Sequence, residues 1–242
     1  MTRRRWIADR WDESTATLSG ATAAHLVRVL RAQAGMEFDI VAGDRVRRGA
    51  IVEIKDTCVD FALGDEVAAE PALPVTLLLA VFKFDRMEWA IEKATELGVE
   101  RIVPVLARRT EKHLAQAAAA RVERWRRIAR EAAQQSRRSD TVVISDPMSV
   151  GYAAKEEPQE LRLLLAEREQ VTSLRQGIDE AHRSGGDPGR LGLAIGPEGG
   201  WTNEEETLFA TEGWRAVSLG PRVLRAETAA IAAVSIVAAL LD

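Results

Sequence analysis

Residues 1 to about 70 carry short stretches in which apolar and polar positions alternate. Gly or Asp separates three of them, at 36–43, 47–56 and 58–63. Alternation with a period of two is typical of short antiparallel strands that bury one face. Leu26, Val29 and Leu30 have helical spacing instead. The pattern therefore predicts a small β-rich domain with one helix.

After a proline-containing linker at 68–74, long apolar runs alternate with helical stripes. The run 75–82 is apolar at almost every position, as expected of a strand that is covered on both faces. The next helical stripe has Asp85 as its expected N-cap and Gly98 as its stop. Strand and helix continue to alternate, which predicts an α/β fold with a parallel sheet over residues 71–242.

Composition narrows the class of protein. The chain of 242 residues has 46% hydrophobic and 29% charged residues, and Cys58 is its only cysteine. A single cysteine excludes an intramolecular disulfide and a cysteine-based metal site, and it favours a reducing compartment. No apolar segment follows the basic N-terminus, and the apolar run 229–241 is too short to span a bilayer. We expect a cytoplasmic protein with no membrane partner and no metal.

Two regions of the chain are rich in arginine although the net charge is −4. Residues 121–138 contain seven Arg and two Glu, and residues 1–55 contain ten Lys or Arg and seven Asp or Glu. Clustered arginines are typical of a surface that binds nucleic acid, and a solvated helix face is the alternative interpretation. The residues that we assign to RNA binding are Arg3, Arg4, Arg5, Arg28, Arg124, Arg127 and Arg130.

Conspicuous loops follow three predicted strands, at 163–169, 194–201 and 218–229. Open parallel sheets bind ligands at the carboxyl ends of their strands. The Gly-Pro-Glu-Gly-Gly turn at 196–200 allows close approach to the backbone, and Thr202 with Glu205 predicts a capping box behind it. No Lys closes the turn as in a phosphate-binding loop, and Glu198 would repel a phosphate. The loops therefore predict a site for a cationic or zwitterionic small molecule.

The stretches AIGPEGGWTNEE (194–205) and SLGPRVLRAETAAIAA (218–233) resemble the RsmE family of knotted SPOUT methyltransferases, which methylate N3 of a uridine in 16S rRNA. Segments 25–35, 82–110 and 130–138 resemble the same family in the same order. The resemblance implies a PUA-like RNA-binding domain over residues 1–70 and a SPOUT domain with a trefoil knot over residues 71–242. It also implies S-adenosylmethionine as the cofactor, rRNA of the small ribosomal subunit as the partner, and a homodimer. The apolar run 229–241 agrees with a dimer contact.

The resemblance also assigns the residues of the site. The cofactor-binding residues that it implies are Leu165, Ile195, Gly196, Pro197, Gly199, Gly200, Ser218, Leu219, Gly220, Val223 and Leu224. Methylation of uracil N3 requires that its proton be removed or that the resulting anion be stabilised. Glu198 and Glu227 are candidate proton acceptors, although an acid at position 227 also suits a helix N-terminus. Arg225 is a candidate to stabilise the anion or grip a phosphate, and Arg138 to reach the site from the second subunit of a dimer.

Two other functions remain open. One is a different SPOUT methyltransferase that acts on tRNA or on a ribose 2′-OH. The other is a non-catalytic RNA-binding or ribosome-assembly factor. The glycine turn and the segment 218–229 favour an enzyme, because a pure binding protein needs no cofactor slot.

Overall fold

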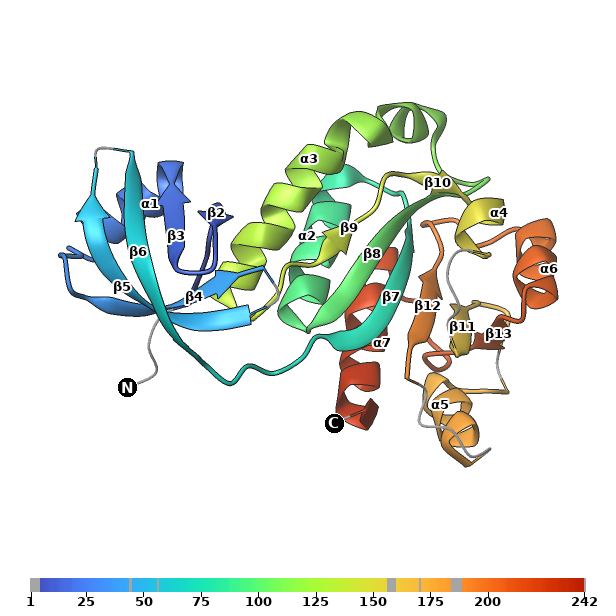
Figure 1. The fold of residues 1–242 in the computed structure, drawn as a ribbon. Helices are drawn as coiled ribbons and strands as arrows, with labels where there is room; N and C mark the ends of the chain where they lie inside the picture. Colours follow the sequence, from blue (N-terminus) through green and yellow to red (C-terminus); the bar gives the residue numbers. More distant parts are fainter. Residues whose placement is uncertain are drawn as a thin grey trace. The chain divides into compact units, whose positions relative to one another are not determined.

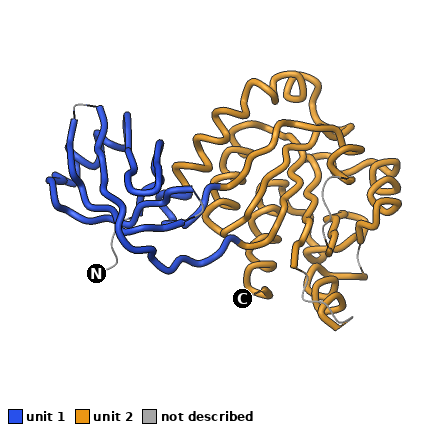
Figure 2. Tube along the Cα trace, viewed as in Figure 1, with its two compact units in different colours: residues 1–72, 133–141 blue, residues 73–132, 142–242 orange. Residues whose placement is uncertain are grey.

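The computed structural model describes residues 5–43, 45–55, 57–155, 160–169, 171–183 and 189–241, which are drawn in Figure 1. The chain forms two compact units, coloured separately in Figure 2. The first unit comprises residues 1–72 together with 133–141, and the second comprises 73–132 and 142–242. The sequence pattern did not predict that the segment 133–141 belongs to the first unit.

The first unit is a curled β-sheet with one helix. Its elements are β1 (Arg5–Ile7), β2 (Arg10–Trp11), β3 (Thr15–Ser19), α1 (Gly20–Arg28), β4 (Glu37–Ala42), β5 (Arg45–Ile54) and β6 (Cys58–Glu66). The strand order is β1-β4-β5-β6-β3-β2, so the two end strands are neighbours along the chain. Between them, the Ala8 N–H donates to Val41 C=O and the Asp9 N–H donates to Thr17 C=O, both at 2.9 Å. One continuous segment therefore pairs with both edges and closes the sheet into a small barrel.

Two details of this unit differ from the predicted pattern. Most strand pairs are antiparallel as expected, but β1 pairs with β4 in parallel. The parallel pair joins segments far apart in sequence, which local alternation cannot reveal. The helix predicted around Leu26 is α1, and it ends at Arg28 with Val29 as an exposed C-cap. Leu26 itself is fully buried in the barrel core.

The segment 133–141 belongs to the first unit through both apolar and polar contacts. Ala133 is fully buried in a small apolar cluster with Val41 of β4. The Arg5 guanidinium donates from Nη1 to the backbone carbonyl of Arg137 at 2.7 Å. These contacts explain why the segment is part of this unit although residues 73–132 of the second unit separate it from residues 1–72.

The second unit is a parallel α/β structure, as the sequence predicts. Its strands are β7 (Leu73–Ala80), β8 (Val99–Leu106), β9 (Val143–Ile144), β10 (Met148–Ser149), β11 (Leu161–Leu165), β12 (Leu191–Ile195) and β13 (Arg215–Val217). Its helices are α2 (Phe84–Glu96), α3 (Lys112–Gln135), α4 (Val150–Ala153), α5 (Leu174–Arg183), α6 (Asn203–Thr211) and α7 (Ala226–Leu241). The strand order is β10-β8-β7-β12-β11-β13, with β9 also paired to β8, and every pairing is parallel.

Side chains of this sheet alternate between two apolar cores, and helices cover both faces (Figure 1). Leu77 and Leu79 of β7 join the core formed with α2, α3, α5 and α7. Leu78 and Ala80 join the core formed with α4 and α6. Because both faces are buried, the strands are apolar at almost every position.

Helix α2 begins two residues earlier than predicted. Its N-cap is Lys83, without a side-chain cap, and Asp85 lies inside the first turn, where its carboxylate suits the helix dipole. The assignment of Asp85 as N-cap is therefore wrong. Gly98 is confirmed as the stop, because its φ of 98° is a left-handed conformation. None of the described helices combines the length and the apolar character that a bilayer span requires.

Candidate functional site

A cavity lies at one edge of the parallel sheet, where three neighbouring strands end. Strands β12, β11 and β13 are adjacent and parallel, so their carboxyl ends lie at the same edge. The loops that follow them line a cavity of about 290 Å³. That volume approaches the roughly 300–1,000 Å³ of small-molecule sites.

Most of the residues expected to bind the cofactor line this cavity. They are Leu165, Ile195, Gly196, Pro197, Gly200, Ser218, Leu219, Gly220, Val223 and Leu224. Gly199 is the one expected residue that does not line the cavity. A Cβ built at Gly199 would lie 3.3 Å from Cδ of Arg109. The fold thus brings together residues from three loops that are far apart in sequence, and their role in binding stays a prediction.

The glycine turn after β12 is tightly held. Gly200 has a φ of 68°, and its N–H donates to Pro197 C=O at 2.8 Å, so the turn requires glycine there. Arg109, in the loop after β8, donates from Nη1 to the carbonyls of Gly199 at 2.6 Å and Trp201 at 3.1 Å. Arg109 also lines the cavity. Sequence reasoning missed it, and its only signal was its position just after a predicted strand.

The capping box predicted from Thr202 and Glu205 is confirmed at the start of α6. The Thr202 N–H donates to Glu205 Oε2 at 2.9 Å, and the Arg108 N–H donates to Glu205 Oε1 at 2.7 Å. One buried carboxylate therefore ties the loop after β8 to the end of the glycine turn. Beside it, hydrogen bonds from its own backbone N–H and from the Thr202 side chain lower the pKa of Glu204.

The loop after β13 forms the opposite wall of the cavity. Gly220 has a φ of 111°, and its N–H donates to Ser218 Oγ at 3.0 Å. No described heavy atom lies within 4 Å of a Cβ built at Gly220, so the loop backbone is open on that side. The backbone of Ser218 is fixed by hydrogen bonds with Thr172 and Leu174 at 2.9 and 2.8 Å. A ligand can therefore approach the backbone of a loop that is itself anchored.

The wall of the cavity carries charges of both signs. Its charged side chains are Arg109, Arg168, Arg222, Glu167, Glu198 and Glu206. Such a wall suits a ligand that has positive and negative groups, as expected from the sequence, because each group can form a charge-assisted hydrogen bond. The described residues contain no cluster of three His, Cys, Asp or Glu side chains that could hold a metal ion.

Two of the predicted catalytic carboxylates converge on one arginine that the sequence did not single out. Arg86 Nη1 lies 2.5 Å from Glu198 Oε1, and Arg86 Nε lies 3.7 Å from Glu227 Oε1. The Glu227 side chain is only 5% exposed, and its Oε2 has no hydrogen-bond partner among the described residues. Arg86 was missed because an arginine on an amphipathic helix is typical of a solvated face.

The two predicted catalytic arginines lie elsewhere. Arg225 is exposed and lies outside the residues that line the cavity, while its carbonyl accepts from the Ala229 N–H at 2.8 Å. Arg138 belongs to the first unit, where its buried guanidinium pairs with Asp140 through an Nε–Oδ1 hydrogen bond of 3.0 Å. Helix α3 ends at Gln135, so Arg138 lies beyond the helix that carries Arg124, Arg127 and Arg130.

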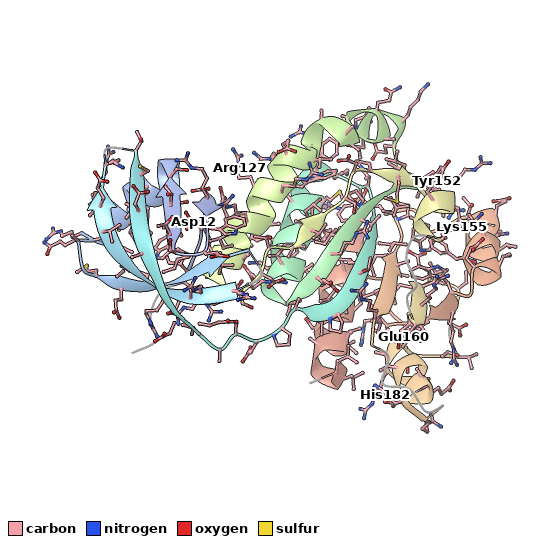
Figure 3. All side chains as sticks on the ribbon, viewed as in Figure 1. Asp12, Arg127, Tyr152, Lys155, Glu160 and His182 are labelled. Carbon is pink, nitrogen blue, oxygen red and sulfur yellow. The ribbon has the colours of Figure 1, made fainter. Side chains whose placement is uncertain are left out.

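The arginines assigned to RNA binding differ in their surroundings. Arg3 and Arg4 lie outside the described residues, whereas Arg28 is exposed at the end of α1. On α3, Arg124 forms a bidentate pair with Glu88 at 2.6 and 2.7 Å. Arg127, labelled in Figure 3, is 63% exposed, and its Nε lies 3.9 Å from Glu131 Oε1, farther than the two Arg124–Glu88 contacts. Arg130 is partly buried on the same helix.

Another side of α3 is buried, since Val122, Trp125, Ala129 and Ala132 all lie in the interior. The helix therefore has an apolar side and an arginine side. His182, labelled in Figure 3, lies in the last turn of α5.

Residues 69–238 match the family described as RNA methyltransferase domain. Ribosomal RNA small subunit methyltransferase E from Synechocystis sp. is 35% identical over 233 residues, which cover 95% of this chain and 75% of that protein. The protein of the same name from Bacillus subtilis is 29% identical over 91% of this chain and 88% of its own length.

Solved structures with bound cofactor are similar over almost the whole chain. The crystal structure of ribosomal RNA small subunit methyltransferase E from Neisseria gonorrhoeae bound to S-adenosyl methionine has a TM-score of 0.81 and 26% identity, and covers 99% of this chain and 98% of that one. The structure of a putative methyltransferase from Legionella pneumophila in complex with SAM has a TM-score of 0.82 and 28% identity, with the same coverage.

Proposed function

Because the chain belongs to the ribosomal RNA small subunit methyltransferase E family, we propose that it methylates N3 of a uridine in 16S rRNA with S-adenosylmethionine as the methyl donor. The observation that carries the proposal is the cavity of mixed charge at the carboxyl ends of β11, β12 and β13. It is lined by the glycine turn and by the anchored loop after β13.

The residues of the cavity fit this cofactor. When bound, S-adenosylmethionine supplies a methyl group on a positively charged sulfur, and it also carries an ammonium and a carboxylate. Glutamates and arginines in the wall can pair with these groups, and exposed backbone of the loop 218–224 can bind the adenine. The protein then contributes to catalysis by positioning the two reactants and by placing charged side chains around them.

Methyl transfer to N3 replaces an N–H bond with an N–CH₃ bond, so one proton must leave the uracil. A carboxylate at the cavity is a suitable acceptor. Glu198 lines the cavity, and Glu227 keeps one oxygen without a hydrogen-bond partner among the described residues. Arg225, two residues before Glu227, would stabilise an anionic uracil or bind a phosphate, and Arg138 would act from the partner subunit.

In this proposal the first unit and the arginine side of α3 each contribute RNA contacts. The closed β-barrel with one short helix supports a PUA-like domain. For the second unit we propose a trefoil knot. After β13, which pairs with β11 at one end of the sheet, the chain returns to pack α7 against α2 and α5. Passage of this returning segment through a loop of the chain would form the knot.

Mass spectrometry of ribosomal RNA nucleosides tests the proposed activity. We expect cells without the gene to lose N3-methyluridine from 16S rRNA and the purified protein to restore it in the presence of S-adenosylmethionine. Loss of a ribose-methylated or tRNA nucleoside instead would identify another SPOUT activity. Unchanged nucleosides, together with no calorimetric binding of S-adenosylmethionine, would identify a non-catalytic RNA-binding protein.

The cofactor slot is tested by Gly220→Val with Gly213→Val as its control. Both glycines have positive φ, 111° and 80°, and neither has a described heavy atom within 4 Å of a built Cβ. Only Gly220 lines the cavity. Both variants should lose stability from backbone strain, of about 1–3 kcal/mol. We expect only Gly220→Val to lose calorimetric affinity for S-adenosylmethionine, and equal affinities in the two variants would contradict the slot.

RNA binding by α3 is tested by the salt dependence of single variants. Each lost phosphate contact should lower the slope of log K against log salt by about 1. We expect Arg127→Ala to flatten the slope more than Arg124→Ala, because Glu88 already neutralises Arg124. Arg175→Ala on α5 is the control, since Arg175 is 73% exposed against 63% for Arg127, and each pairs with an acidic residue four positions later. A wild-type slope for Arg127→Ala would indicate a solvated helix face.

Light scattering tests the proposed homodimer. One side of α7 is buried, but Ile231, Ala232 and Ala239 on other sides are apolar and retain exposure. Trp89 on the neighbouring α2 is 48% exposed. We expect a dimer mass at micromolar concentration and a monomer for Trp89→Glu. Tyr152→Glu is the control, because this 76% exposed aromatic lies on α4, labelled in Figure 3. A monomeric wild-type protein would contradict the dimer.

A further inference from the structure

Arg86 occupies an unusual position for a cation. It lies in the first turn of α2, where the helix dipole disfavours positive charge. It also lies outside the residues that line the cavity, so it has no direct place in the cofactor slot. Its guanidinium instead contacts two carboxylates from distant parts of the chain, Glu198 at 2.5 Å and Glu227 at 3.7 Å. These two contacts offset the unfavourable location.

The two carboxylates belong to the two segments that close the cavity. Glu198 is the central residue of the glycine turn, and Glu227 follows directly on the loop after β13, at the start of α7. Glu198 lines the cavity; Glu227 is not among the lining residues, but Ala226 and Ala229 on either side of it are. One guanidinium with several fixed donors can hold two carboxylates in a defined geometry, which a lysine cannot do. Arg86 thereby joins the turn to the helix behind the cavity.

The two contacts are unequal, and this divides the roles of the carboxylates. Glu198 makes the close charged hydrogen bond, so Arg86 compensates most of its charge. Glu227 is farther from the guanidinium and keeps a buried oxygen without a partner among the described residues, which costs free energy. Buried acceptors left unpaired are typical of functional sites. Glu227 is therefore the carboxylate with unused capacity to accept a hydrogen bond or a proton.

We propose that Arg86 is a positioning residue for methyl transfer. It holds the carboxylates of Glu198 and Glu227 in fixed positions relative to each other, and Glu227, which keeps a free carboxylate oxygen among the described residues, is the proton acceptor. This inference rests on the proposed methyltransferase activity. As the new N3–CH₃ bond forms, the S–CH₃ bond of the methyl donor breaks and its electron pair stays on the sulfur, which leaves as a neutral thioether. The N3–H bond breaks with its electron pair on nitrogen, and the proton passes to the Glu227 carboxylate and then to solvent. Arg86 itself touches neither reactant and acts through the two glutamates.

The test compares Arg86→Gln, Arg86→Lys, Glu227→Gln and the double variant Arg86→Gln with Glu198→Gln. The control is Arg215→Gln, which breaks the Arg215–Glu180 pair of the same 2.5 Å N···O distance on β13 and α5. Three quantities are measured: kcat on RNA, calorimetric affinity for S-adenosylmethionine, and hydrogen exchange of residues 196–201 and 226–230 in the ligand-free protein.

We expect Arg86→Gln to lower kcat about 10- to 100-fold, as a misplaced reacting group does, while cofactor affinity changes much less. Exchange should become faster in both segments, and Arg86→Lys should recover only part of kcat. Glu227→Gln should lower kcat at least as much as Arg86→Gln. The double variant should be little worse than Arg86→Gln alone, because the two side chains act as one unit. Arg215→Gln should match the wild type.

Three results would overturn the inference: unchanged kcat in Arg86→Gln, equal losses of kcat and cofactor affinity, or unchanged exchange in both segments. If Arg86→Gln does not fold, faster exchange in Arg86→Lys still decides the positioning role. A wild-type protein that does not methylate uridine N3 would remove the proposed function, whereas the exchange measurement would still show whether Arg86 joins the two segments.

Discussion

The position of β11 between β12 and β13, in parallel with both, is the constraint on which the cavity depends. Parallel neighbours end at the same edge of a sheet, so the three loops that follow them meet there. An antiparallel strand among the three would send its loop to the opposite edge. Leu165, Gly196 and Gly220 are far apart in sequence and line one cavity for this reason. The arrangement of the site residues therefore depends on the backbone hydrogen bonds that pair these three strands.

The walls of the cavity are held by groups that are not themselves in the predicted site. Arg109 donates to two carbonyls of the glycine turn, and Glu205 accepts from the loop after β8 and from Thr202. Arg86 contacts Glu198 and Glu227 from α2. Arg109 and Glu205 join the loop after β8 to the glycine turn and the residues that follow it, and Arg86 joins α2 to the glycine turn and to the start of α7. Loops on such a support keep a ligand-binding shape without being regular structure themselves.

Local signals explain which parts of the fold the sequence predicts. The apolar runs of the second unit are buried on both faces, Gly98 stops α2 with a positive φ, and Thr202 with Glu205 caps α6. The glycine turn and the loop after β13 were recognisable because strand ends in a parallel sheet are where ligands bind. Their geometric convergence follows from the strand order.

Features that depend on distant partners were not predictable in this way. The parallel pairing of β1 with β4 and the place of Ala133 in the first unit involve contacts over long sequence separations. Arg86 was missed for the same reason, since only the fold brings its acidic partners Glu198 and Glu227 next to it. An arginine pattern on a helix indicates an exposed side, but it cannot show that Glu88 already neutralises Arg124.

The return of residues 133–141 to the first unit has a consequence for how such a protein can evolve. The first unit is built from two separate stretches of chain, and the second unit is likewise interrupted. A genetic exchange that transfers only residues 1–72 would deliver a barrel without Ala133 and without the carbonyl that Arg5 binds. Recombination at a single junction is therefore disfavoured, and the two units are expected to be inherited together as one block.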